Sequence, residues 1–124
     1  MNSNPVIWFE LYVQDMNRAR RFYESVFGFK LTPIDTPTPG MEMLGFPMGE
    51  GKVGAGGALC RMEGAPTGGG GTLVYFSCDD CAVEAKKAAS NGGRIFKDKF
   101  SIGKYGSIAL VFDPEGNMIG LHSM

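Results

Sequence analysis

One pattern of elements occurs twice in this sequence, and no other feature restricts the fold as strongly. In the first copy, apolar and polar residues alternate from Val6 onward, as they do along a strand whose two faces differ. Asp15 follows in the position of a helix N-cap, and Gly28 supplies the left-handed residue that commonly ends a helix. Between them, apolar residues spaced for one helical stripe are Met16, Ala19, Phe22, Tyr23, Val26 and Phe27. This stretch predicts a strand followed by a helix.

The second copy has the same order of signals. An extended run from Gly71 to Cys78 precedes the capping pair Asp79-Asp80, and a helical face of small residues then follows. Its members are Ala82, Val83, Ala85, Ala88 and Ala89. Moving 65 positions along the sequence carries Val13 onto Cys78 and Gly28 onto Gly93 without a gap, which indicates an internal repeat.

Three strand-length runs follow each predicted helix, and turn residues separate them. They cover residues 29–35, 41–48 and 53–62 in the first copy, and 94–100, 107–112 and 117–122 in the second. We therefore predict an α+β fold of two βαβββ modules in one domain, 1–124, with module one at 6–63, a Gly-rich linker at 64–71 and module two at 72–122. One module of about 60 residues is marginal alone, so the modules should pack together or exchange between chains, and we expect a homodimer.

Composition excludes several classes of function. With a formal net charge of -1 there is no basic field for phosphates, so we expect no nucleic-acid partner. No apolar run is long enough to span a bilayer and no signal peptide is evident, which predicts a cytoplasmic protein without membrane contact. Three cysteines favour reduced thiols. Cys78 and Cys81 form a C-x-x-C pair, but the two Asp between them raise the thiol pKa and argue against a redox role.

The repeat and its motifs resemble those of the vicinal oxygen chelate superfamily, which includes glyoxalase I, bleomycin resistance proteins and extradiol dioxygenases. The resemblance rests on Val13-Gln14-Asp15, Arg20-Arg21-Phe22-Tyr23, Val26-Phe27-Gly28-Phe29 and Asp113-Pro114-Glu115-Gly116-Asn117. It covers Val6 to His122 and implies that the two modules curl into a mixed sheet around a cup-shaped cavity. In that superfamily, residues from the first and last strand of each module converge on a divalent metal.

This chain departs from the superfamily at those metal positions. The first-strand positions hold Trp8 and Leu73, and the last-strand positions hold Gly120 and a residue near Gly57. None of these side chains can hold a metal ion, which needs several oxygen or nitrogen donors together. We therefore expect neither a metal site nor a cofactor.

The residues expected to line the cup are Trp8, Glu10, Tyr75 and His122. Glu10 shares a strand face with Trp8, Tyr75 is its counterpart in the repeat, and His122 lies two residues beyond Gly120. In a partly dry pocket Glu10 becomes a candidate general base for a proton beside a carbonyl. The plainer alternatives are that Glu10 pairs with an Arg and that His122 is a solvated chain end.

These residues predict a glyoxalase/bleomycin-resistance-like protein that binds a small organic molecule without the usual metal. The alternative is a metal-dependent lyase or isomerase resembling lactoylglutathione lyase, and a third is a purely structural partner domain. Three methionines near the Gly-rich turns, Met41, Met43 and Met48, are core residues by default and otherwise an adaptable pocket wall.

Overall fold

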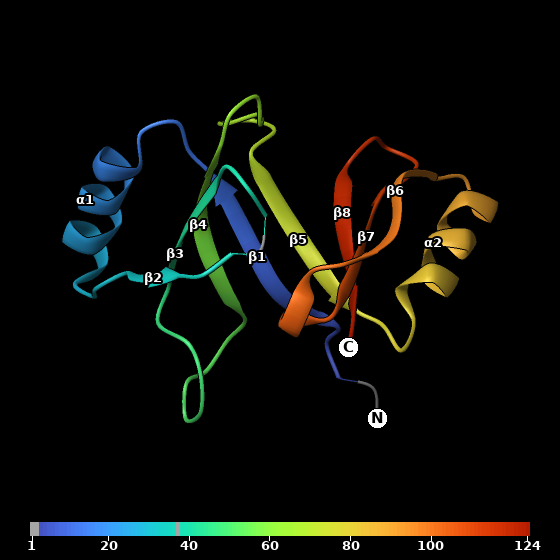
Figure 1. The fold of residues 1–124 in the computed structure, drawn as a ribbon, viewed down its shortest axis with the longest axis horizontal. Coiled ribbons are helices and arrows are strands. Elements are labelled where there is room, and N and C mark those ends of the chain that lie inside the picture. The colour runs from blue at the N-terminus through green and yellow to red at the C-terminus, as the bar shows by residue number, and fades with distance from the viewer. Residues whose placement is uncertain (1–2, 37) are drawn as a thin grey trace. The chain divides into compact units, whose positions relative to one another are not determined.

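The computed structural model describes residues 3–36 and 38–124, and the chain forms two compact units. The first unit is Trp8–Thr72, and the second unit combines residues 3–7 with Leu73–Met124. In each unit, one helix covers one face of a set of four strands (Figure 1). In the part of the chain that is described, no helix is both long enough and apolar enough to cross a membrane.

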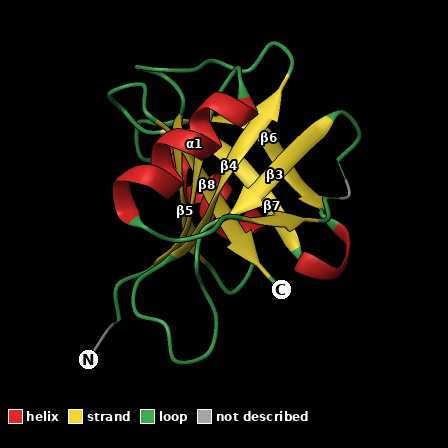
Figure 2. Ribbon diagram, turned by 90° about the vertical axis from the view of Figure 1, so that its left-hand side faces the viewer, coloured by secondary structure: helices red, strands yellow, loops and turns green. Residues whose placement is uncertain are grey.

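The first unit contains one helix and four strands. In chain order these are β1 (Val6–Tyr12), α1 (Met16–Phe27), β2 (Thr32–Ile34), β3 (Met41–Gly45) and β4 (Gly56–Met62). The strands lie in the order β1-β4-β3-β2, with β1 parallel to β4 and the other neighbours antiparallel. Figure 2 shows α1 lying across the strands of this unit.

The second unit repeats this arrangement. Its elements are β5 (Thr72–Ser77), α2 (Cys81–Ser90), β6 (Arg94–Ser101), β7 (Ser107–Phe112) and β8 (Met118–Ser123), with a 3-10 turn at Gly103–Tyr105. The order is β5-β8-β7-β6, and β5 is parallel to β8 as β1 is to β4. The predicted α+β fold of two βαβββ modules is therefore confirmed. The 3-10 turn was not predicted.

The core of the first unit lies between α1 and its strands. Its buried members are Met16, Leu31, Leu44 and Leu59. The predicted stripe of α1 is only partly used, because Phe22, Val26 and Phe27 are 57%, 57% and 62% exposed. The stripe is thus wider than the surface that these strands cover.

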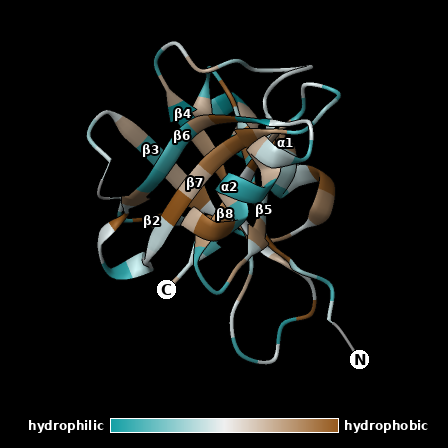
Figure 3. Cartoon of the chain, turned by 90° about the vertical axis from the view of Figure 1, so that its right-hand side faces the viewer, coloured by the Kyte–Doolittle hydropathy of each residue, from teal (hydrophilic) through white to brown (hydrophobic). Residues whose placement is uncertain are grey.

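The core of the second unit lies between α2 and β7–β8, and is made of Cys81, Ala85, Ala109, Val111 and Leu121. Seen from this unit's side, the α2 ribbon carries hydrophilic residues, whereas β7 is mostly hydrophobic (Figure 3). The predicted cap is confirmed, since the Asp80 side chain accepts a hydrogen bond of 3.1 Å from the Ala82 N–H. The sequence indicates Cys81 as a member of the C-x-x-C pair but not as a core residue, and its side chain belongs to this core.

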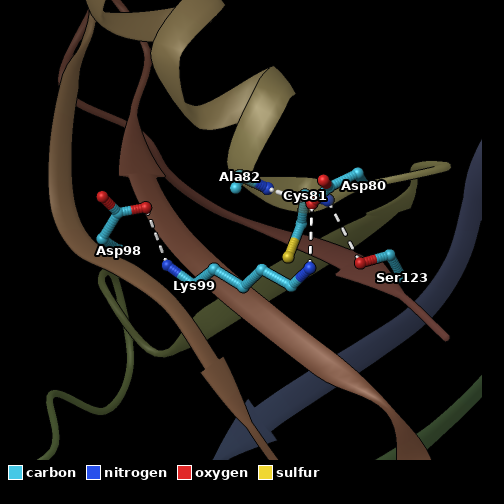
Figure 4. A network of polar contacts seen from close by, with 6 residues as sticks. All are labelled: Asp80, Cys81, Ala82, Asp98, Lys99 and Ser123. Carbon is cyan, nitrogen blue, oxygen red and sulfur yellow. Dashed lines mark hydrogen bonds and ion pairs between the residues drawn. The ribbon is translucent and has the colours of Figure 1, made fainter.

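Polar contacts fix the start of α2 (Figure 4). The Lys99 ammonium donates to Asp80 Oδ1 at 3.0 Å, and the Cys81 N–H donates to the Ser123 hydroxyl at 3.1 Å. The hydrogen bond from Lys99, followed by the one from the Ala82 backbone, lowers the pKa of Asp80. Asp80 therefore remains ionised at neutral pH and supports the helix N-terminus with negative charge.

The two glycines that the repeat aligns have different physical roles. Gly28 ends α1 in the left-handed conformation, with φ 77°. In the second unit, Gly92 takes the left-handed conformation, with φ 93°, and α2 is capped at Asn91. Gly93 is needed for space, because a Cβ there would lie 2.4 Å from the Phe112 carbonyl oxygen and 3.0 Å from that of Ala88.

Replacing Gly93 with Ala should destabilise the fold by about 2 kcal/mol, because the new methyl group meets backbone atoms that cannot move aside. Urea unfolding of the variant measures this loss. Gly69→Ala is the matched control: a Cβ at Gly69 has no neighbour within 4 Å, so its effect should stay below about 0.5 kcal/mol. Equal midpoints for the two variants would contradict this account of Gly93.

Candidate functional site

Strand alternation divides the side chains of β1 between two faces. Leu11 packs into the core beneath α1, and the Phe9 ring lies 5.2 Å from the Phe46 ring on that side. Trp8, Glu10 and Tyr12 therefore point to the opposite face. The strand register adds further residues to it, and we call the set the Glu10 face: Trp8, Glu10, Tyr12, Thr32, Ile34, Met41, Met43, Gly45, Gly56, Ala58, Cys60 and Met62.

Glu10 is held by its two neighbours on this face. The Trp8 indole N–H donates to Glu10 Oε2 at 3.0 Å, and the Tyr12 hydroxyl donates to Glu10 Oε1 at 2.7 Å. Glu10 is only 6% exposed, so these bonds offset part of the cost of removing a carboxylate from water. Sequence reasoning paired Glu10 with Trp8 but missed Tyr12. The same spacing of two residues could have identified it.

The Glu10 carboxylate also acts on a buried thiol of β4. Cys60 lies opposite Tyr12 and is completely buried. Burial, and secondarily the charge of Glu10, raise the pKa of Cys60. The thiol therefore stays protonated at neutral pH, and Cys60 behaves as an apolar residue of the face rather than as a nucleophile.

In the second unit, Tyr75 and His122 share the face opposite α2. Tyr75 pairs with Gly120 in β8, and its ring lies so close that a Cβ at Gly120 would be 2.2 Å from it. His122 pairs with Ser77, and its Nε2 lies 2.6 Å from the Tyr105 carbonyl oxygen. Because a carbonyl only accepts, Nε2 carries the proton, and in the neutral ring Nδ1 then keeps the lone pair.

The four residues predicted for the cup thus form two pairs, one in each unit. Trp8 and Glu10 are in direct contact in the first unit. Tyr75 and His122 lie on one face of β5 and β8 in the second unit. That both pairs line one cavity stays a prediction.

The register also settles which residues occupy the superfamily's metal positions. Ala58 lies opposite Glu10 just as Gly120 lies opposite Tyr75, so the last-strand position of the first module is Ala58, one residue beyond Gly57. With Trp8 and Leu73 at the first-strand positions, none of the four side chains offers a lone pair to a metal. Within residues 3–36 and 38–124, no three His, Cys, Asp or Glu side chains are grouped to hold one. These residues do not fit the metal.

The fold and the repeat agree with a family assignment by sequence. The family described as the Glyoxalase/Bleomycin resistance protein/Dioxygenase superfamily matches residues 6–121. The chain belongs to this superfamily. The resemblance inferred from the motifs is therefore confirmed.

Similar superfamily proteins come from several organisms. "Putative glyoxylase CFP32" of Mycobacterium bovis is 31% identical over 116 residues, which are 92% of this chain but only 43% of that protein. The chain therefore spans less than half the length of this relative. A "Glyoxylase-like domain-containing protein" of Didymella fabae is 28% identical over 110 residues, covering 87% of this chain and 84% of that protein.

Solved structures share the fold at low sequence identity. The hypothetical protein BH1468 of Bacillus halodurans has a TM-score of 0.73 at 14% identity, covering 99% of this chain and 96% of that one. Methylmalonyl-CoA epimerase of Streptomyces coelicolor, in complex with 2-nitronate-propionyl-CoA, has a TM-score of 0.66 at 17% identity, covering 98% and 95%. At such identities the likeness shows the fold alone.

The C-x-x-C pair of this superfamily member has the properties of structural thiols. Burial, with the charge of Glu84 as the next cause, raises the pKa of Cys78, whereas a redox thiol needs a lowered pKa. Cys81 is fully buried, and all three cysteines are free. The geometry therefore agrees with the expectation of reduced thiols.

A cleft of about 420 Å³ lies in the first unit, between the start of α1 and the β2–β3 pair. Met41 and Met43 line it, as an adaptable pocket wall would, although the sequence did not indicate the cleft itself. Its one basic residue, Arg20, is already bound to Glu24 Oε2 at 3.1 Å and to the Leu31 carbonyl at 3.3 Å. The Leu31 N–H in turn is the main cause of the lowered pKa of Glu24. Arg20 therefore has a structural role in holding Glu24 and Leu31, and we do not count it as a ligand-binding residue.

Replacing Tyr12 with Phe should destabilise the protein by about 2 kcal/mol, because the buried Glu10 carboxylate loses a hydrogen bond of 2.7 Å. Urea unfolding provides the measurement. Tyr23→Phe is the control, since Tyr23 lies in the aromatic cluster beneath α1, and its loss should be much smaller. If both variants unfold at the wild-type midpoint, Tyr12 does not support Glu10.

Proposed function

We propose that this chain binds a small organic molecule on the Glu10 face, without the metal that the superfamily pattern implies. The observation that carries the proposal is the buried Glu10 carboxylate, which is oriented by the Trp8 indole and the Tyr12 hydroxyl. Both oxygens are held in place from their own strand, so the carboxylate is presented in a fixed position. A fixed polar group among apolar residues is typical of small-molecule sites.

The chemistry of the face suggests what the molecule carries. An ionised carboxylate accepts hydrogen bonds and donates none, and the Trp8 indole and the Tyr12 hydroxyl hold the Glu10 carboxylate in place. A ligand that it recognises therefore carries a hydrogen-bond donor. The indole and the methionines of the face provide apolar contact for the rest of the ligand.

A second candidate is proton abstraction beside a carbonyl, with Glu10 as the general base. The Trp8 and Tyr12 donors hold this carboxylate in one orientation, as a general base requires. The solved epimerase structures, and the relatives described as glyoxylases, make a carbonyl-containing substrate reasonable for this second candidate. A metal-dependent lyase or isomerase finds no support at Trp8, Ala58, Leu73 and Gly120.

The single tryptophan makes the proposal directly testable, since Trp8 is the only one in the chain and contacts Glu10. We expect small molecules that co-purify, identified by mass spectrometry, to change Trp8 emission when they are added back to stripped protein. Glu10→Gln should weaken this binding at least about tenfold, since it removes the charge that assists the hydrogen bond.

Glu42→Gln is the matched control, because Glu42 is more than half exposed on the other face of β3, and it should bind like wild type. Normal binding by Glu10→Gln, together with a lower melting temperature, would assign Glu10 a structural role and end the proposal. Turnover of the identified molecule that Glu10→Gln abolishes would select the second candidate.

We also propose a cytoplasmic homodimer, as the reduced cysteines and the exposed apolar side chains of α1 suggest. Light scattering at micromolar concentration should give about twice 13.3 kDa. Phe22→Glu should halve that mass, whereas Phe96→Glu, at an equally exposed site of β6, should not. A wild-type mass near 13.3 kDa would contradict the dimer.

A further inference from the structure

A bulge in β6 turns one of its lysines away from α2. Ile95 pairs with Val111 and Lys97 pairs with Leu110, so Phe96 and Lys97 together lie opposite a single residue of β7. Bulges of this kind change the direction in which side chains point. Lys97 therefore shares a face with Leu110, whereas Ile95, two residues earlier, packs against the core beneath α2.

A second irregularity separates Lys97 from the next lysine of the strand. Phe100 lies on the same face as Lys97, because their partners in β7 are two residues apart. Lys99, between them, points to the other face, where its ammonium donates to Asp80 at 3.0 Å (Figure 4). β6 thus divides its lysines: Lys99 supports the start of α2, and Lys97 lies on the opposite face.

The face that carries Lys97 is positively charged. We call its outer part the Lys97 surface, which consists of Arg94, Phe96, Lys97, Phe100, Leu110 and Phe112. It contains two cations. None of the residues that the strand register places on this face of β5–β8 is an Asp or a Glu, so its potential favours an anion.

Aromatic rings hold both cations over this surface. The Lys97 ammonium lies 4.1 Å from the centre of the Phe100 ring, and the Arg94 guanidinium lies 4.3 Å from that of Phe112. Within the described part of the chain, neither cation is in ion-pair contact with a carboxylate. Because the rings already restrict these side chains, less conformational entropy is lost when an anion binds.

We propose that the Lys97 surface binds a small organic anion, a carboxylate carried on a flat apolar body. Lys97 pairs with the carboxylate, and Arg94 adds to the positive potential. Leu110 is half-buried and Phe96 is 57% exposed, so both offer apolar contact to the body of the ligand. The inference goes beyond the proposed function, because it uses residues of the second unit alone.

Benzoate is a suitable probe, because it joins one carboxylate to a flat apolar ring. In NMR titrations of the full chain, benzoate should shift the backbone amide signals of Lys97 and Leu110 in a saturable way. Lys97→Gln should raise the Kd at least about fivefold, since the charge that assists the hydrogen bond is lost. Lys97→Arg keeps the charge and should stay within about twofold of wild type.

Lys87→Gln is the matched control, because it removes the same charge from an exposed residue of α2, which covers the other face of these strands. It should leave the Kd for benzoate unchanged, and urea midpoints should show that all variants fold. Acetate has the carboxylate without the ring, and benzamide has the ring without the charge. Both should bind more weakly than benzoate.

Three results would overturn the inference: no saturable shifts on β6 and β7, an equal loss of affinity in Lys87→Gln, or acetate binding as tightly as benzoate. The proposed function is judged separately, by Trp8 emission and the Glu10→Gln variant. Loss of benzoate binding in Lys97→Gln supports the Lys97 surface whether or not the Glu10 face binds a ligand.

Discussion

The two-residue period of the strands is the constraint on which the rest of this structure depends. In each unit the first strand pairs in parallel with the last, and alternation sends its odd and even residues to opposite faces. One face must be covered by the helix, which selects Leu11 and Leu59 for the core of the first unit. The same choice leaves Glu10 and Cys60 on the other face. The same alternation of side chains therefore determines both the core residues and the residues of the candidate site.

This coupling explains why a carboxylate occupies so buried a position. A glutamate without partners would cost several kcal/mol in an apolar environment. Trp8 and Tyr12, two residues away on either side, are placed by the same alternation to donate to it. Both donors come from the same strand as Glu10, at a spacing of two residues. Burial, with the charge of Glu10 as the lesser cause, raises the pKa of the Cys60 thiol, so the face has one charged group and little other reactivity.

The two units use the same topology for different chemistry. The position of Glu10 is taken by Tyr75 in the second unit, and the position of Cys60 is taken by His122. Where the superfamily pattern calls for metal ligands, this chain has an indole, a leucine, an alanine and a glycine. Gly120 makes room for the Tyr75 ring, and Gly45 and Gly56 make room for Met48. These glycines thus provide space for the side chains of neighbouring residues.

Much of this protein was determined by the sequence itself. Periodicity, caps and the repeat predicted the order of both modules, and alternation placed Glu10 beside Trp8, because these signals are local and act within a few residues. The pairing and register of the strands could not be predicted from these local signals. Only the tertiary structure placed Ala58, rather than Gly57, opposite Glu10 and buried Cys81 in the core. It also brought Gly93 close to the backbone of another strand, so that this glycine is needed for space rather than to end the helix, and it laid Met48 across two strands. Each of these depends on which distant backbone segment lies alongside, and a single sequence carries no local signal for that distance.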